Sequence, residues 1–155
     1  MIYYFIIEYN RGKDVLKMNN EMLVKIIVSE DISSQQNGPS VSNIIINPVL
    51  ALRAPFVPTA LSLAVTVLTS GITPNESHRM EINITNANGN ADEPAIYSTG
   101  ENDFAIPGAS DNFNFNLDLK NIPFMDEGKY KVNFIFDGKT FSDVFSVVAS
   151  QKLSK

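Results

Sequence analysis

The chain carries one histidine and no cysteine, so few of its residues could act as a nucleophile or a general base. His78 follows Asn75, Glu76 and Ser77 in a segment with the composition of a turn, where its ring is expected to meet water. A general base needs a nucleophile or substrate proton within hydrogen-bond reach, and the sequence supplies no partner for His78. The serines form neither a Gly-x-Ser-x-Gly elbow nor a supported Ser-x-x-Lys site. We therefore expect no catalytic residue and a protein that is not an enzyme.

Oxygen-bearing side chains gather between Asn86 and Asp111, a long segment rich in Asn, Gly, Asp and Pro. Calcium prefers several oxygen ligands, and long loops often carry function. The candidate calcium ligands are Asp92, Glu93 and Asp103. The segment lacks the full EF-hand pattern, and amide-rich turns are ordinarily solvated loops, so we favour a loop without metal or cofactor. Binding of carbohydrate or calcium by this loop is the alternative.

Two apolar connectors could contact a protein partner. Phe56 and Val57 lie between Pro55 and Pro58, and Phe124 and Met125 follow Pro123. A rigid aromatic side chain on a proline-stiffened backbone loses little entropy on binding, so these four residues are partner-contact candidates. The favoured alternative is that Phe56 and Phe124 cover the open ends of the core.

The elements that must position these residues read as strands, because apolar and polar residues alternate. A strand of near-perfect alternation runs from Tyr130 to Phe136 and turns at Asp137-Gly138, a pair suited to a tight hairpin. The final strand, Thr140 to Val148, has apolar residues in both phases, which indicates two covered faces or a bulge. The segment from Ser33 to Ser42 is expected to be a loop, and Pro48 indicates an edge or a bulge. The other expected strands are Met22–Val28, Asn43–Leu52, Leu61–Val67, Met80–Ile84, Ala95–Tyr97, Phe104–Ile106 and Phe113–Leu119, and the expected core includes Leu63, Val65, Ile82, Phe115, Leu117, Tyr130 and Phe134.

Length and charge narrow the class of protein. A chain of 155 residues with 44% hydrophobic residues can bury one substantial core, and one domain is the expectation. The net charge of -5 repels phosphate backbones and anionic lipids, so we expect neither nucleic acid nor membrane as a partner. The abundance of Asn, Ile and Lys suggests an AT-rich genome, as in a low-GC bacterium or its phage.

The chain divides into an N-terminal extension (residues 1–17), a single β-sandwich domain (residues 18–149) and a frayed tail (residues 150–155). The apolar run Ile2–Ile7 is too short to span a bilayer and lacks the features of a signal peptide, so a cytoplasmic location is expected. The extension is either an edge strand or a segment upstream of a native start at Met18. In the neighbouring strand Met22–Val28, Lys25 is the only charged residue that would oppose pairing of this strand with another chain. We therefore expect a homodimer or higher oligomer built with the N-terminal region.

Residues Asp126-Glu127-Gly128-Lys129-Tyr130 resemble the tyrosine corner of immunoglobulin-like domains. The resemblance implies a structural site of Asp126, Gly128 and Tyr130, in which the tyrosine hydroxyl bonds to nearby backbone. Without Cys or Trp, the chain is more similar to the disulfide-free bacterial members. The order of strands and prolines from Met22 to Val148 also resembles small uncharacterised bacterial and phage-associated proteins with such a sandwich. That resemblance implies no known activity.

The sequence thus predicts an all-β, immunoglobulin-like antiparallel β-sandwich of about seven to nine strands. The function expected for it is that of a non-enzymatic protein-interaction or structural module, with self-association or another protein as partner.

Overall fold

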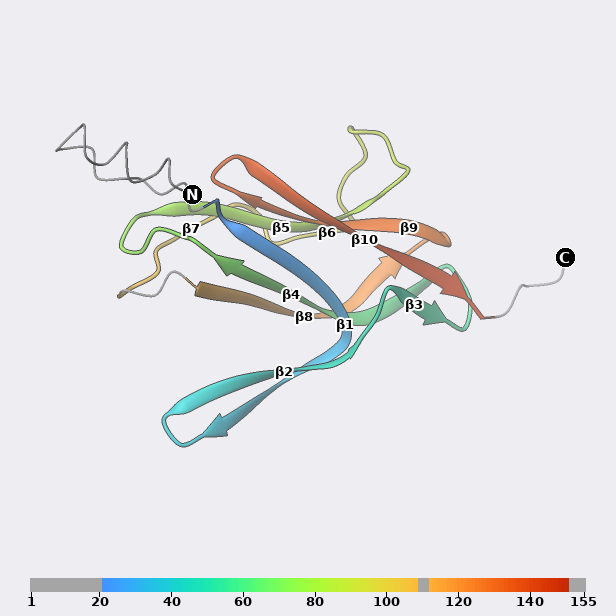
Figure 1. Cartoon of the computed structure of the whole chain (residues 1–155). Coiled ribbons are helices and arrows are strands. Elements are labelled where there is room, and N and C mark those ends of the chain that lie inside the picture. Colours follow the sequence, from blue (N-terminus) through green and yellow to red (C-terminus); the bar gives the residue numbers. More distant parts are fainter. Residues whose placement is uncertain (1–20, 109–111, 151–155) are drawn as a thin grey trace, which may run out of the picture.

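The computed structural model describes residues 21–108 and 112–150, a region built of ten strands and no helix (Figure 1). The predicted all-β antiparallel sandwich is confirmed, and the immunoglobulin-like type stays a prediction. Ten strands exceed the predicted seven to nine because the single expected strand Asn43–Leu52 is two strands, Ser40–Pro48 and Ala51–Ala54. The bounds are β1 (Leu23–Asn37), β2 (Ser40–Pro48), β3 (Ala51–Ala54), β4 (Thr59–Ser70), β5 (His78–Asn86), β6 (Tyr97–Ser98), β7 (Asn102–Phe104), β8 (Asn112–Phe124), β9 (Gly128–Phe136) and β10 (Lys139–Ala149).

The strands form two sheets that face each other. One sheet has the order β2-β1-β4-β8, and the other has the order β3-β10-β9-β5-β6, with β7 also pairing with β5. Neighbouring strands are antiparallel except β3, which pairs in parallel with residues 146–149 of β10. β2 lies at the end of its sheet, so the edge position predicted from Pro48 is confirmed.

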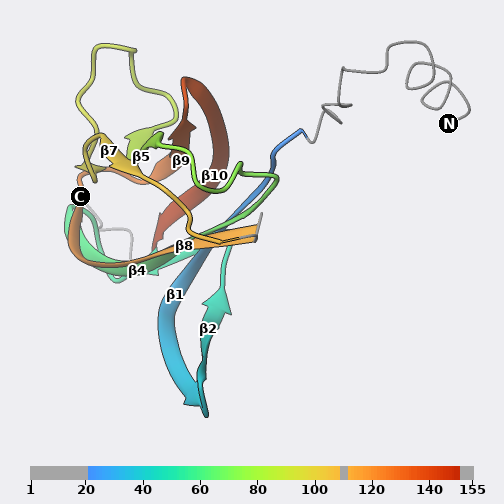
Figure 2. The ribbon, with the colours of Figure 1, turned by 90° about the vertical axis from the view of Figure 1, so that its left-hand side faces the viewer.

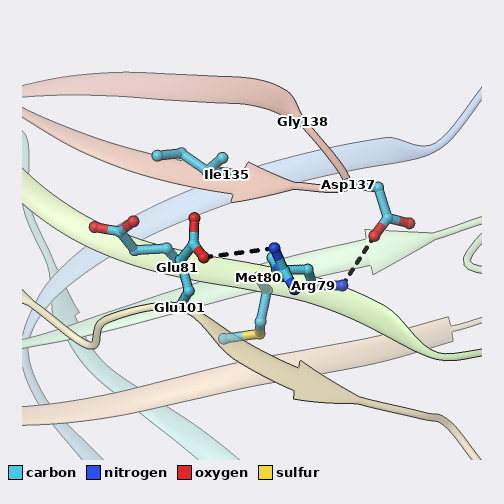
Figure 3. A pocket seen from close by; sticks show the side chains of 7 residues that line it. All are labelled: Arg79, Met80, Glu81, Glu101, Ile135, Asp137 and Gly138. Carbon is cyan, nitrogen blue, oxygen red and sulfur yellow. Dashed lines mark hydrogen bonds and ion pairs between the residues drawn. The ribbon is translucent and has the colours of Figure 1, made fainter.

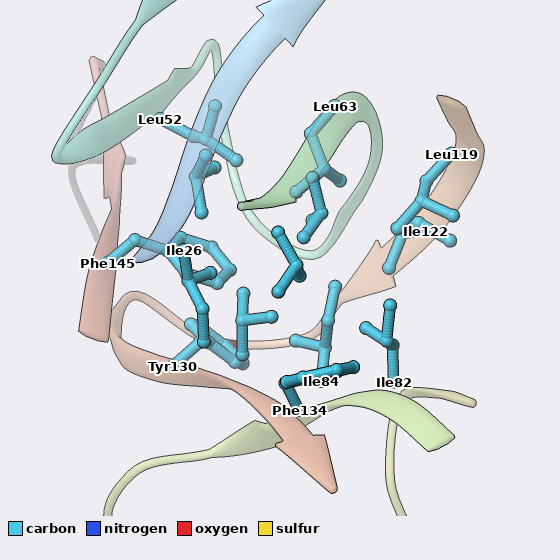
Figure 4. Close-up of a cluster of buried hydrophobic side chains, with 14 of the residues drawn as sticks. Ile26, Leu52, Leu63, Ile82, Ile84, Leu119, Ile122, Tyr130, Phe134 and Phe145 are labelled. Carbon is cyan, nitrogen blue, oxygen red and sulfur yellow. The ribbon is translucent and has the colours of Figure 1, made fainter. Parts of the chain in front are cut away.

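The core lies between the sheets, where alternation places one apolar face of each long strand (Figure 4). On β9, Tyr130, Val132 and Phe134 are buried while the residues between them are partly exposed. β4 supplies Leu63, Val65 and Val67 from the opposite sheet. Of the seven predicted core residues, five are buried, and Phe115 and Leu117 are partly buried against the same cluster.

The last strand, β10, differs from the prediction. Phe145 and Val147 are buried, but Val144 and Val148 are exposed, and the pairing with β9 shows no register shift. Both proposed explanations, two covered faces or a bulge, are therefore wrong. One apolar phase of β10 simply faces outward.

The predicted loop from Ser33 to Ser42 is also wrong, because these residues continue β1 and β2 as a hairpin. Residues 23–29 of β1 pair with β4, and beyond that point β2 is the neighbour with which β1 pairs in the described structure. The two strands leave the sandwich as a ribbon, and we name residues 30–47 the β-arm (Figure 2). Its turn has Gly38 at φ 63°, a left-handed conformation that glycine adopts without strain.

The expectations for residues 1–17, for a start at Met18 and for residues 151–155 lie outside the described residues. Within the described ranges, no helix has the length and apolar character needed to cross a membrane.

Candidate functional site

His78 is not a solvated turn residue, as the sequence predicted, but a buried side chain at the start of β5. Its exposed fraction is 7%, and the ring lies 5.0 Å from that of Phe136. Its Nδ1 is 2.7 Å from Asp137 Oδ2 and its Nε2 is 2.7 Å from the Thr73 carbonyl oxygen. The pairing of β5 with the β9–β10 hairpin brings Asp137 there, across 59 residues of sequence. Both ring nitrogens are occupied, so His78 has a structural place in the fold.

The two partners stabilise each other's charged forms. Burial alone would lower the pKa of His78, but the hydrogen bonds to Thr73 and Asp137 and the negative charges of Asp137 and Glu76 outweigh burial and raise it. Burial alone would raise the pKa of Asp137, but hydrogen bonds from the Arg79 backbone and from His78, together with the charge of His78, lower it. Since both neighbours of the ring are acceptors, the imidazolium form satisfies both contacts.

A hollow of about 420 Å³ lies on the outer side of β5 and β9, beside this pair (Figure 3). Arg79 lies within it and contacts Asp103 at 3.3 Å and Glu101 at 3.7 Å, and its backbone N–H donates to Asp137. All three side chains in these ion pairs are largely exposed, so the pairs contribute little stability. The seven lining residues include no Ser, Thr, Cys or His, and the ionisable ones are Arg79 and the carboxylates of Glu81, Glu101 and Asp137.

The structure separates the calcium candidates of the long loop. Asp103 is in β7 beside Arg79, whereas Asp92 and Glu93 are exposed between β5 and β6. The end of the loop, residues 109–111, lies outside the described residues. Across the part of the chain that the structure describes, no three acidic, histidine or cysteine side chains are grouped so as to hold a metal ion. Ligand binding by this loop stays a prediction.

The two apolar connectors lie at the same end of the sandwich, because Thr59 pairs with Phe124. Phe124 is fully buried and meets Tyr130 edge-on at 4.9 Å, so it belongs to the core. Phe56 is 50% exposed, so the favoured interpretation that it covers the core is wrong. Val57 packs against the buried cluster instead. Met125 is exposed like Phe56, so these two side chains are accessible to a partner.

The predicted tyrosine corner has the hydrogen bond that it requires. The Tyr130 hydroxyl donates to the Asp126 carbonyl oxygen at 2.6 Å. Gly128 lies between them at φ 140°, a backbone conformation that residues other than glycine rarely adopt. The corner fixes the entry into β9, and this role is structural.

Sequence reasoning also missed the β-arm. Ser34 donates to the Asn43 side chain across the ribbon at 3.0 Å, and Asn47 donates to Glu30 at its base at 2.9 Å. From Ile32 to Ile46 the arm carries no charged side chain. The signal that could have found it is Gly38, because glycine is favoured at the first position of a two-residue hairpin turn, here Gly38-Pro39 between the paired residues Asn37 and Ser40.

The arm exposes apolar side chains although it lies outside the core. Val41 is 65% exposed, Ile44 is 42% exposed and Ile46 is 37% exposed. Among the described residues, β2 has β1 as its only strand neighbour, so its outer edge presents unpaired backbone groups. An uncharged strand edge with exposed isoleucines can pair with a strand of another chain.

Comparison with known proteins gives a family but no activity. No curated protein matches the chain. A solved structure, the crystal structure of beta-glucosidase from Listeria innocua in complex with glucose, is similar over 82% of this chain at 10% identity, with a TM-score of 0.43. The chain spans 16% of the length of that protein, and a likeness of this degree carries no argument about function. The model of DUF6941, a family of unknown function, matches residues 12–145, so the chain belongs to this family.

Proposed function

We propose that the chain is a non-enzymatic protein-interaction or structural module that engages another protein chain through its β-arm. The observation that carries this proposal is a ribbon without charge from Ile32 to Ile46 that projects from the sandwich and exposes Ile44 and Ile46. A two-stranded hairpin is marginally stable by itself in water, and a third strand supplies the missing hydrogen bonds and apolar cover.

The exposed isoleucines of the arm are not part of the hydrophobic core. Ile44 and Ile46 belong to no part of the buried cluster, which is built from the two facing sheets. Surface isoleucines on an open strand edge favour aggregation unless a partner covers them. A partner strand paired with β2 would cover the exposed isoleucines and would also bond to the unpaired backbone groups of the outer edge. The composition, rich in Asn and Ile, supports a bacterial or phage assembly as the setting.

The test is affinity purification of the full chain from cells that produce it, beside two variants. Ile44→Lys combined with Ile46→Lys places charge on the arm, and Val144→Lys places charge on β10, where Val144 is also exposed. We expect the same protein to accompany the wild type and Val144→Lys, and to be absent from the arm variant. Recovery of the same proteins with all three would overturn the proposal.

A further inference from the structure

Before it ends at Asn47, which has φ 49°, and Pro48, the outer edge of β2 lacks the protection that edge strands ordinarily have. Charged side chains, prolines and bulges usually guard such edges against pairing with another chain. Residues 41–47 of β2 read Val-Ser-Asn-Ile-Ile-Ile-Asn, with no charge and no proline before Pro48. A short segment of high β-propensity without charge pairs readily with a copy of itself.

The isoleucines are placed so that two copies of β2 match each other. In an antiparallel pair related by a two-fold axis at Ile45, this residue faces its own copy and Ile44 faces Ile46 of the second copy. Such a seam consists of three isoleucine pairs, and cross-strand apolar pairs stabilise a sheet. An axis at Ile44 or at Ile46 would place an isoleucine opposite Asn43 or Asn47, so the axis at Ile45 is the best match.

The distribution of charge favours a second copy at this edge. The chain has a net charge of -5, so two copies repel each other at long range. Between Ile32 and Ile46 there is no charge to oppose contact. The other free edge of the ribbon, on β1, has Glu30 and Asp31 at its base and only polar residues in 33–37, so it lacks the apolar match.

We propose that two copies of the chain associate through the outer edges of β2, antiparallel and with the two-fold axis at Ile45. The arms then form a four-stranded ribbon of order β1-β2-β2-β1, and each sandwich lies at one end of it. This inference rests on the proposed function of the arm, and it names a second copy as the partner. It differs from the dimer expected from the sequence, which was to be built with the N-terminal region.

Cysteine cross-linking tests the register directly, because the chain has no cysteine of its own. In Ile45→Cys, the two introduced thiols face each other across the axis, within the distance that a disulfide requires. We expect oxidation to convert most of this variant to a covalent dimer. In the matched control Val41→Cys, the two thiols lie about 26 Å apart along the ribbon and should not cross-link. Equal cross-linking of both variants would overturn the register.

Light scattering tests the association without oxidation. We expect the wild type to have twice the 17.1 kDa mass of the chain. Ile44→Lys should raise the dissociation constant of the dimer at least about tenfold, because each copy then places a like charge beside the seam. Val144→Lys should leave the constant unchanged. A dimer that Ile44→Lys does not weaken would show that the interface lies elsewhere and overturn the inference.

The two proposals fail in different ways. A monomeric wild type without cross-linking of Ile45→Cys overturns pairing with a second copy. If purification from cells still yields a different protein that depends on the arm, the proposed function of the arm stands. If purification yields no arm-dependent protein either, both proposals are overturned.

Discussion

Replacement of His78 by alanine should destabilise the protein by about 2 to 5 kcal/mol. The variant loses two hydrogen bonds of 2.7 Å, which contribute about 0.5 to 1.5 kcal/mol each. It also loses a buried ring that packs against Phe104 and Phe136, a contribution of about 1 to 2 kcal/mol. The side chain of Asp137 is 46% exposed, so water screens the ionic part of the contact and we add nothing for it.

Urea denaturation followed by circular dichroism measures this loss. The urea concentration at which half of the protein is unfolded should fall. The slope of the unfolding free energy against urea concentration should stay unchanged, because the surface exposed on unfolding is nearly the same. Glu76→Ala is the matched control, since Glu76 is an exposed neighbour in the same turn and its loss should change stability by less than about 0.5 kcal/mol. A loss below about 1 kcal/mol for His78→Ala would refute the reasoning that its ring is a structural link.

The same pair makes stability depend on pH. The pKa of His78 is raised in the folded state, so its contribution is fully present below the unfolded value of about 6.5 and is lost as pH rises through the folded pKa. Stability should therefore fall as pH rises above about 6.5, and His78→Gln should remove that part of the slope. The chain has one histidine, so the slope can be assigned. Equal slopes for wild type and variant would contradict the assignment.

Three further outcomes are expected. Phe134→Ala should cost about 3 to 5 kcal/mol because the side chain is fully buried, and a loss below about 1 kcal/mol in urea denaturation would place it outside the core. Tyr130→Phe should cost about 0.5 to 1.5 kcal/mol through loss of the bond to Asp126, whereas no measurable change would argue against the corner. Millimolar calcium should leave the melting temperature nearly unchanged, and a clear rise that Asp92→Ala with Asp103→Ala abolishes would favour the ligand-binding alternative.

Alternation predicted the strands that bury one face. On β9 and β4 the pattern from Tyr130 to Phe134 and from Leu63 to Val67 identifies strand and phase together, because the side chains of one phase lie in the core. The Asp137-Gly138 turn was predictable for a local reason, since both residues have positive φ. Local patterns are sufficient where the physical cause is local.

The features that sequence reasoning missed have causes that are distant along the chain. Nothing in the sequence near His78 indicates that its ring is hydrogen-bonded to Asp137, because the contact arises from the pairing of β5 with β9. Val144 is exposed although its strand is apolar in both phases, because its side chain lies on the face of β10 that points away from the core. The β-arm was missed because a ribbon outside the core has no buried face. Residues 33–43, most of which are polar, therefore lack the alternation of apolar and polar residues that identifies a strand.

Apolar residues occur both in the part of this sheet that lines the core and in the β-arm, but for different physical reasons. Ile26 and Val28 of β1 are buried between the sheets, so their apolar character is explained by folding. Past Ser29 the strand leaves β4, and folding of the sandwich no longer requires apolar residues there. Residues 44–46, all isoleucine, nevertheless lie in this outer part, where exposure of isoleucine is unfavourable in water. Because the core of the sandwich does not include them, contact with another chain is the physical reason that best accounts for their presence.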